Sequence, residues 1–451
     1  MSCNDCNRAD LLRRAAAEAG RGLPSIEPGM PLPAGTGMSR RSFVLGASGM
    51  AVAVFGGSRL LSPQAVEAAI VPLSSQRILL SVFMSGGADT LSVLFPAGDP
   101  LYRQYRPTLG LDPSGATQFA EDSRLFWHPA AAPFATLHAE GKLTVLPAIG
   151  YDHPDQSHFT SRHYWEVGAL DPQLRTGWLG RYLDTVGTQD NPLQGLSLDS
   201  GLLPSLATAT APVAALDRPD RYLFSDSGTA RFPLEAQMLK AAGAIGSAHA
   251  VGPDTALRQA GRAAQQALHL RNQLGTFTDV GTKVPYPPTN DPFPSRLAGL
   301  AAMIGAGLPL HCVSITAPGH YDTHAAQPQA LSDGLKLTAD SLLAFQRDLE
   351  QRGLADRVVV HVWSEFGRRA KENGSQGTDH GAAGVGFLIG SRVRGGMIGE
   401  YPGLQSGLDG RGNLQATADF RGVYSALIAQ WLGGDPSRII PGTFAQPSLI
   451  R

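Results

Sequence analysis

The sequence has almost no net charge and few cysteines. Each of these absences argues against certain classes of function. The 451 residues carry a formal net charge of −1 at pH 7, which gives no electrostatic reason to expect nucleic acid or an anionic membrane surface as a partner. The three cysteines are Cys3, Cys6 and Cys312. So few exclude a disulfide framework, and Cys312 lies in an apolar run that is typical of a buried, inert thiol.

The N-terminal region has the pattern of a targeting segment. Residues 39–45, SRRSFVL, form a twin-arginine pattern, and a weakly apolar stretch follows over residues 44–57. That stretch is shorter than the ~20 residues a spanning helix needs, so we expect no stable membrane span. Small residues near positions 66–68 suit signal cleavage. The alternative is a buried helix that follows two arginines by chance.

We therefore predict a twin-arginine signal and N-terminal extension over residues 1–69, with one mature domain over residues 70–451. The twin-arginine translocase would be the export partner, because this motif is read by a receptor and is not an anchor. The mature chain would then be periplasmic, attached to the cell surface or extracellular.

Strand-like and helical segments alternate along the rest of the chain. With 43% hydrophobic residues, 53 Gly and 33 Pro, the composition favours a loop-rich α/β protein with a large core. Short apolar runs typical of buried strands span residues 77–84, 143–149, 310–316, 357–363 and 385–389. Helical patterns follow near residues 158–168, 335–349 and 423–432. This order predicts a mostly parallel central sheet covered by helices on both faces.

Residues 171–295 have a different character. They contain Pro-rich loops, an Ala-rich helical stretch around residues 255–273, and the segment KVPYPPTNDPFPS over residues 283–295. We expect an inserted cap and linker here. The alternative is a packed side layer with no role in specificity.

Polar side chains gather where the predicted strands end. In an open α/β sheet, ligands bind outside the carboxyl ends of the strands, so these side chains are predicted to share one site. Carboxylates and imidazoles suit Zn²⁺ or Mn²⁺. The set consists of Asp89, Ser157, Asp322, His324, Glu365 and, one loop later, His380.

Five segments of the sequence resemble the domain-of-unknown-function 1501 family. They are GGADTLSVLFP, QSHFTSRHYWEVG, GHYDTHAAQ, SEFGRRAKENGSQGTDHG and DFRGVYSALIAQWLGG. The resemblance covers roughly residues 77–434. It implies a secreted protein of the alkaline phosphatase and sulfatase superfamily, with an alkaline-phosphatase-like fold.

The resemblance also implies roles for these residues. Ser157 would be the nucleophile that opens a helix. Asp89 and Glu365 would hold one metal ion, and a second ion would be held by the set Asp322, His324 and His380. Two such ions clamp the attacking and leaving oxygens of an in-line displacement. The implied cofactor is one or two divalent ions, Zn or Mn.

Two departures from the superfamily pattern bear on the metal count. Only Thr323 separates Asp322 from His324, and Phe366 stands after Glu365 where a histidine is frequent. The side of the site that contains Asp89 therefore lacks a nitrogen ligand, and one metal would bind weakly or not at all.

Each of these residues also has a purely structural interpretation that the sequence leaves open. An Asp in a glycine turn forms Asx-turns, a Ser before a helix caps it, an Asp-His pair can cap a loop, and an isolated Glu can pair with a nearby arginine. Three further polar residues lie close to the same loops and are expected to orient the ligands or contact the substrate: His158, Arg162 and Asp379.

Two functions of different class follow. The first is an exported metal-dependent hydrolase of phosphate or sulfate esters with a serine nucleophile and a small anionic ester as substrate. The second is a secreted binding or surface-assembly protein that keeps the fold without turnover. Whether the protein is an enzyme is left open by the sequence.

Overall fold

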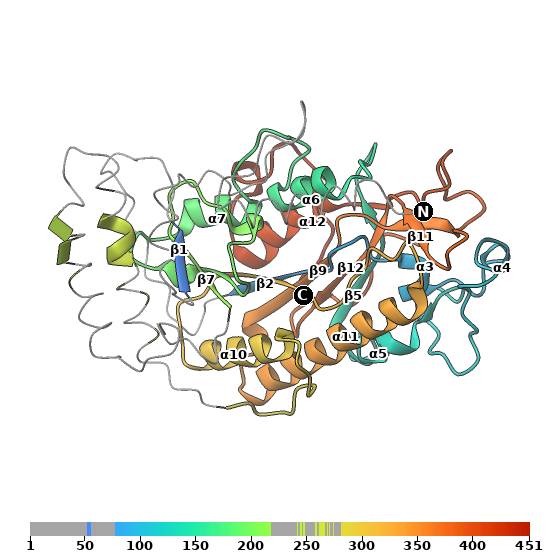
Figure 1. Cartoon of the computed structure of the whole chain (residues 1–451), viewed down its shortest axis with the longest axis horizontal. Helices are drawn as coiled ribbons and strands as arrows, with labels where there is room; N and C mark the ends of the chain where they lie inside the picture. Colours follow the sequence, from blue (N-terminus) through green and yellow to red (C-terminus); the bar gives the residue numbers. More distant parts are fainter. Residues whose placement is uncertain are drawn as a thin grey trace.

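The computed structural model describes residues 77–217 and 281–451, together with the strand at 52–55 and scattered helical positions between residues 241 and 274. A ten-stranded sheet passes through the centre of the molecule (Figure 1). Nine strands follow the order β1-β7-β6-β8-β2-β9-β12-β5-β13, and β14 also pairs with β5. Their bounds are β1 Val52–Phe55, β2 Ile78–Phe83, β5 Leu143–Gly150, β6 Gly195–Ser197, β7 Val213–Leu216, β8 Cys312–Thr316, β9 Val358–Trp363, β12 Gly384–Ile389, β13 Gly396–Met397 and β14 Ala418–Asp419.

The sheet is mostly parallel, as predicted. Strands β7, β6, β8, β2 and β9 run in one direction. Strand β12 is antiparallel to both β9 and β5, so β5 points the same way as β9. The carboxyl ends of β8, β2, β9 and β5 therefore meet at one edge, and the N-terminal end of β12 lies at the same edge.

Strand side chains alternate between two cores, which explains the continuous apolar runs of the sequence. Ile78, Leu80 and Val82 of β2 face one core, whereas Leu79 and Phe83 face the other. Both sets are buried. A parallel strand covered on both sides has no polar face, so its residues read as an unbroken apolar stretch.

Helices cover each face of the sheet (Figure 1). One layer consists of α5 Ala132–Ala139, α10 Phe293–Gly305 and α11 Gln327–Gln351, and it packs in the first core. The other layer consists of α6 His158–Val167, α7 Trp178–Val186 and α12 Phe420–Ala426, which continues as a π-helix over Leu427–Leu432. Two short helices, α3 Thr90–Val93 and α4 Tyr102–Tyr105, follow the turn after β2.

Two small sheets lie beside the main one. Strand β3 (Leu94–Phe95) pairs with β4 (Phe126–Trp127), and β10 (Arg368–Glu372) pairs with β11 (Thr378–His380). The second pair forms an antiparallel ribbon in the loop between β9 and β12. This ribbon returns the chain to the carboxyl edge of the main sheet.

The region expected to be an inserted cap is partly integral to the sheet. Within residues 171–217, β6 and β7 extend the sheet beyond β8, and α7 packs on its surface. Most of residues 218–280 lie outside the described residues, so the cap itself stays a prediction.

The twin-arginine pattern and the expected cleavage point, residues 66–68, also lie outside the described residues. Strand β1, from the predicted apolar stretch, pairs antiparallel with β7 at the edge of the sheet. Among the described helices, none is both long and apolar enough to cross a membrane.

Candidate metal centre

Two glycines let three strand ends approach one another. Gly86 and Gly87, just after β2, have φ angles of +121° and +79°. Residues other than glycine rarely adopt positive φ angles. A Cβ on Gly86 would lie 2.2 Å from the backbone nitrogen of Asp322, and one on Gly87 would lie 2.4 Å from the ring of Phe366. The loops after β2, β8 and β9 therefore touch at the carboxyl edge of the sheet.

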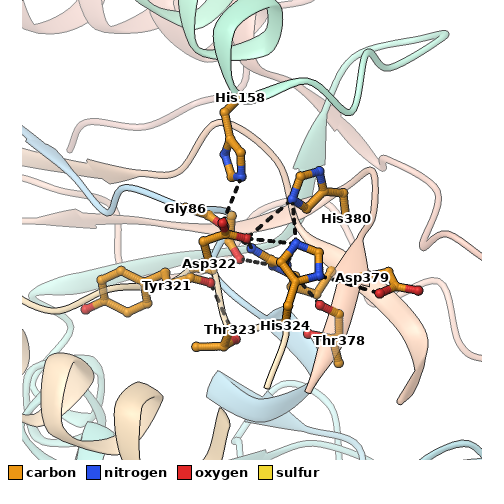
Figure 2. A network of polar contacts seen from close by, with 12 residues as sticks. Gly86, His158, Tyr321, Asp322, Thr323, His324, Thr378, Asp379 and His380 are labelled. Atoms are coloured by element: carbon orange, nitrogen blue, oxygen red, sulfur yellow. Dashed lines mark hydrogen bonds and ion pairs between the residues drawn. The ribbon is translucent and has the colours of Figure 1, made fainter. Parts of the chain in front are cut away.

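Three histidines direct the same ring nitrogen toward Asp322 (Figure 2). The His324 Nε2 atom lies 2.9 Å from His380 Nε2 and 3.0 Å from Asp322 Oδ1. His380 Nε2 lies 3.3 Å from that oxygen. The buried Nε2 atom of His158 makes no hydrogen bond and lies 3.4 Å from Asp322 Oδ2.

The Nδ1 atoms of His158 and His380 each face an oxygen that accepts a hydrogen bond, whereas His324 Nδ1 lies 3.5 Å from Asp379 Oδ1. Such a partner fixes the Nδ1–H tautomer of a neutral imidazole and leaves a lone pair on Nε2. The hydrogen-bonded pairs are His158 Nδ1 with Glu365 Oε1 at 2.8 Å and His380 Nδ1 with the Gln156 carbonyl at 2.7 Å.

This arrangement fits a divalent metal ion. With its Nδ1 protonated, His380 presents an Nε2 lone pair 2.9 Å from His324 Nε2, a contact that a proton on His324 Nε2 or a cation between the two rings would satisfy. A tetrahedral zinc ion with Zn–N bonds of ~2.0–2.1 Å separates its ligand atoms by about 3.3 Å. The contacts of Asp322 with the three rings, and the contact between His324 and His380, are 2.9 to 3.4 Å long. The donor atoms of His158, Asp322 and His380 all lie within 4.8 Å of one another, a grouping that could hold a metal ion. Imidazole nitrogen and carboxylate oxygen are both ligands that zinc takes in proteins.

Charges in the cluster are strongly coupled. Burial lowers the pKa of His158, but hydrogen bonds and charge interactions with Asp322 and Glu365 outweigh burial and raise it to about 9. Burial raises the pKa of Asp322, but the three histidines and Arg368 outweigh it and hold this pKa well below its usual range. Burial, with a smaller contribution from Arg368, lowers the pKa of His380. Without a metal, His158 therefore holds a proton that a metal would have to displace.

Arg368 is a member of the site that the sequence did not reveal as such. Its Nη2 donates to Asp322 Oδ1 at 2.5 Å. It lies directly opposite His380 in the β10–β11 ribbon, so strand pairing brings it to the cluster. Arg368 is the first residue of β10, three positions after Glu365, and nothing in the local sequence marks it as a site residue.

Asp89 lies in a separate buried network. Its Oδ2 accepts from Arg106 Nη1 at 2.5 Å, from Ser92 Oγ at 2.6 Å and from Gln327 Nε2 at 2.6 Å, while Oδ1 accepts from Arg106 Nη2 at 2.9 Å. Both Asp89 and Arg106 are fully buried. The structure thus does not bring Asp89 to the histidine cluster, and its expected role as a ligand stays a prediction.

Ser157 begins α6 without capping it. The residue is at the N-cap position, yet its side chain makes no capping hydrogen bond. Its neighbours in the chain both reach the cluster, since the Gln156 carbonyl faces His380 and the His158 ring faces Glu365. Aromatic stacking of Trp165 on Trp363 and Phe420, with ring centroids 5.6 Å and 4.5 Å apart, fixes α6 over the sheet.

Of the predicted residues, the structure therefore gathers His158, Asp322, His324, Glu365, His380 and, at the rim, Asp379. His158, expected only to orient ligands or touch substrate, is at the centre. The description that emerges is an α/β protein with a three-histidine, one-aspartate cluster at the carboxyl edge of a mostly parallel sheet.

The chain belongs to the DUF1501 family, described as "Protein of unknown function (DUF1501)", whose model matches residues 147–412. That match confirms the family resemblance. No curated protein matches the chain.

Several solved structures are similar to the chain at low identity. The lipoteichoic acid synthase LtaP from Listeria monocytogenes is 9% identical with a TM-score of 0.33, over 82% of this chain and 76% of that one. A sulfatase from Pseudoalteromonas sp. is 10% identical with a TM-score of 0.34, over 80% and 68%. A protein in the alkaline phosphatase superfamily from Vibrio parahaemolyticus is 7% identical with a TM-score of 0.32, over 95% and 75%.

Proposed function

We propose that this protein is an exported metal-dependent hydrolase of phosphate or sulfate esters, with Ser157 as the nucleophile. The observation that carries the proposal is the convergence of three Nε2 atoms on Asp322, with the His158 and His380 rings each oriented by an oxygen at Nδ1. A metal ion held by these atoms, Zn²⁺ or Mn²⁺, would supply Lewis acidity toward a phosphoryl or sulfuryl oxygen.

The roles of the surrounding residues follow from their contacts. Glu365 holds the His158 ring, and Asp379 faces the ring of His324. Such second partners keep the imidazoles oriented and raise their basicity. In the reaction, the Ser157 oxygen forms a bond to phosphorus or sulfur while the ester oxygen leaves as the alcohol, and water then releases the acid.

Arg162 is suited to hold the anionic end of the ester. It lies one helical turn after His158 on α6, and its Nε donates to Glu166 at 2.8 Å. Its guanidinium lies 4.6 Å from the centroid of the Phe83 ring, at the end of β2. Neither Nη atom makes a hydrogen bond within the described part of the chain, so this held guanidinium has a free edge that matches two oxygens of a phosphate or sulfate.

The experiment compares Ser157→Ala with Thr160→Ala, a control that also removes a hydroxyl from the first turns of α6. Purified mature proteins are assayed on an aryl phosphate and an aryl sulfate, with bound metal and melting temperature measured in parallel. Loss of the nucleophile is expected to reduce turnover by several orders of magnitude with metal content unchanged. Turnover preserved in Ser157→Ala would contradict the role of Ser157.

A non-catalytic binding protein is the second candidate. The commitment of both Asp89 oxygens to Arg106 favours it, because that carboxylate is then not available to a second metal. Wild-type protein that binds metal but hydrolyses neither ester would support this second function.

A further inference from the structure

The carboxylates expected to hold a separate metal ion are both saturated. A carboxylate has about four lone-pair sites, and Asp89 accepts four hydrogen bonds from Arg106, Ser92 and Gln327. The Glu365 carboxylate accepts from the backbone N–H groups of Gly86 and Gly87 at 3.0 to 3.2 Å, from Ser364 at 3.1 Å and from His158 at 2.8 Å.

A metal at that position would have to break these contacts inside the protein. Asp89 is fully buried and the side chain of Glu365 is 2% exposed. Removing their donors would leave buried N–H groups and the Arg106 guanidinium without partners, which is costly. The cluster around Asp322 differs because three histidine Nε2 atoms converge on one carboxylate. A metal there would compete with Arg368, whose Nη2 donates to Asp322 Oδ1 and whose Nη1 lies 3.5 Å from His324 Nε2.

The guanidinium of Arg368 already places a fixed positive charge next to the Asp322 carboxylate. The Arg368 side chain is fully buried. Its Nε donates to the Gly87 carbonyl at 2.9 Å, its Nη1 to the Thr378 carbonyl at 2.9 Å, and its Nη2 to the Gly86 carbonyl and to Asp322. Arginine stays protonated in proteins, so these contacts hold one permanent charge next to the ligand carboxylate.

We propose that the centre takes a single divalent ion, held by Asp322 and the Nε2 atoms of His158, His324 and His380, and that Arg368 is the fixed second positive charge of the site. Glu365 then positions His158 and is not itself a ligand. This inference rests on the metal dependence in the proposed function, and it replaces a two-ion centre by one ion and one guanidinium.

The test is a metal titration of the purified mature chain after stripping with a chelator. Zinc and manganese are titrated separately, and bound metal is counted by mass spectrometry and calorimetry. Wild type is expected to saturate at one equivalent. Glu365→Gln is expected to keep one equivalent with about 10- to 100-fold weaker binding, as for other residues that orient a ligand, whereas Asp322→Asn is expected to lose the ion.

Arg368→Gln is compared with Arg369→Gln, the next residue of the same strand, whose side chain makes none of these contacts. Removing the charge beside Asp322 is expected to tighten zinc binding tenfold or more, and the control is expected to bind as wild type does. Equal or weaker binding by a folded Arg368→Gln variant would overturn the role of Arg368. If that variant does not fold, the wild-type and Glu365→Gln stoichiometries still decide the metal count.

The outcomes separate this inference from the proposed function. Two equivalents in wild type, falling to one in Glu365→Gln, would overturn the inference and leave a hydrolase intact. One equivalent without hydrolysis of either ester would support the inference and contradict the proposed function. Absence of bound metal at saturating zinc and manganese would overturn both.

Discussion

Arg162 offers a residue-level test of where the anionic group binds. Its Nε is held by Glu166, and its ring contact with Phe83 orients the guanidinium, so its free edge is preorganised. We expect Arg162→Gln to raise KM for an aryl phosphate at least tenfold, and Arg162→Lys to show a smaller increase because it keeps the charge without the planar fork. Steady-state kinetics measure both. Unchanged KM in both variants would show that Arg162 is only a solvated helix residue.

Individual site residues could be predicted where they follow a strand end. Asp322 and His324 follow β8 and Glu365 follows β9, and parallel strands bring their carboxyl ends to one edge. His380 lies one loop further on, in β11. The role of His158 was harder to assign, since Ser157 and His158 are adjacent and only the helix start decides which side chain points inward. The partner of Asp89 was not predictable, because Arg106 lies 17 residues away, directly after α4.

The turn after β2 is the element on which the site geometry depends. Gly86 has a φ of +121°, and a Cβ there would overlap the Asp322 backbone. We expect Gly86→Ala to destabilise the protein by about 3 kcal/mol or more and to reduce metal binding, because the β8 loop must shift. Gly115, with a φ of +78° and nothing within 4 Å of an added Cβ, is the matched control. Its alanine variant is expected to cost about 1 kcal/mol from backbone strain alone.

Urea unfolding and zinc titration of the two variants measure these effects. A Gly86→Ala protein as stable as Gly115→Ala, with wild-type zinc affinity, would mean that the approach of the two loops is not required.

Helix α11 is joined to the end of α5 by a charged group of side chains. Glu140 accepts from Arg347 and from Lys142, and both cations also pair with Glu350. The hydrogen bond with Arg347, followed by that with Lys142, lowers the pKa of Glu140 to about 2 against partial burial. A lowered folded-state pKa stabilises the protein above the unfolded pKa of ~4.3, and that stability is lost as the pH falls toward 2.

We therefore expect Glu140→Gln to reduce the free energy of unfolding at pH 7 by about 1 kcal/mol or less, since these side chains are partly exposed to solvent. The difference from wild type should shrink between pH 4 and pH 2. Chemical unfolding across this range measures it, and a difference that stays constant with pH would contradict the charge interpretation.

The main elements were predictable because of their composition. The runs at 77–84, 143–149, 357–363 and 385–389 are β2, β5, β9 and β12, since strands buried on both faces are continuously apolar. The antiparallel direction of β12 was not predictable, because an apolar run has no direction. The short strands β6 and β7 lie among loops that contain Pro and Gly. Their local composition is that of loops, so the sequence did not predict them as strands of the main sheet.

For the whole molecule, export is the property that the sequence predicts most directly. Arg40 and Arg41 precede a short apolar stretch, and replacement of both by lysine is expected to keep the full-length precursor in the cytoplasm. Cell fractionation and immunoblotting of the double variant measure this. Normal export of that variant would exclude the twin-arginine route without bearing on the catalytic site.

Metal-dependent hydrolysis by the Asp322 cluster is the central claim for the molecule. The most direct measurement follows turnover of an aryl phosphate and an aryl sulfate while zinc or manganese is added back to chelator-stripped protein, for wild type and for His380→Ala. The claim predicts no turnover by stripped wild type, recovery that reaches its plateau as the Asp322 site fills, and at least a hundredfold lower plateau in His380→Ala. Turnover of stripped protein equal to that of untreated protein, or equal recovery in His380→Ala, would contradict it.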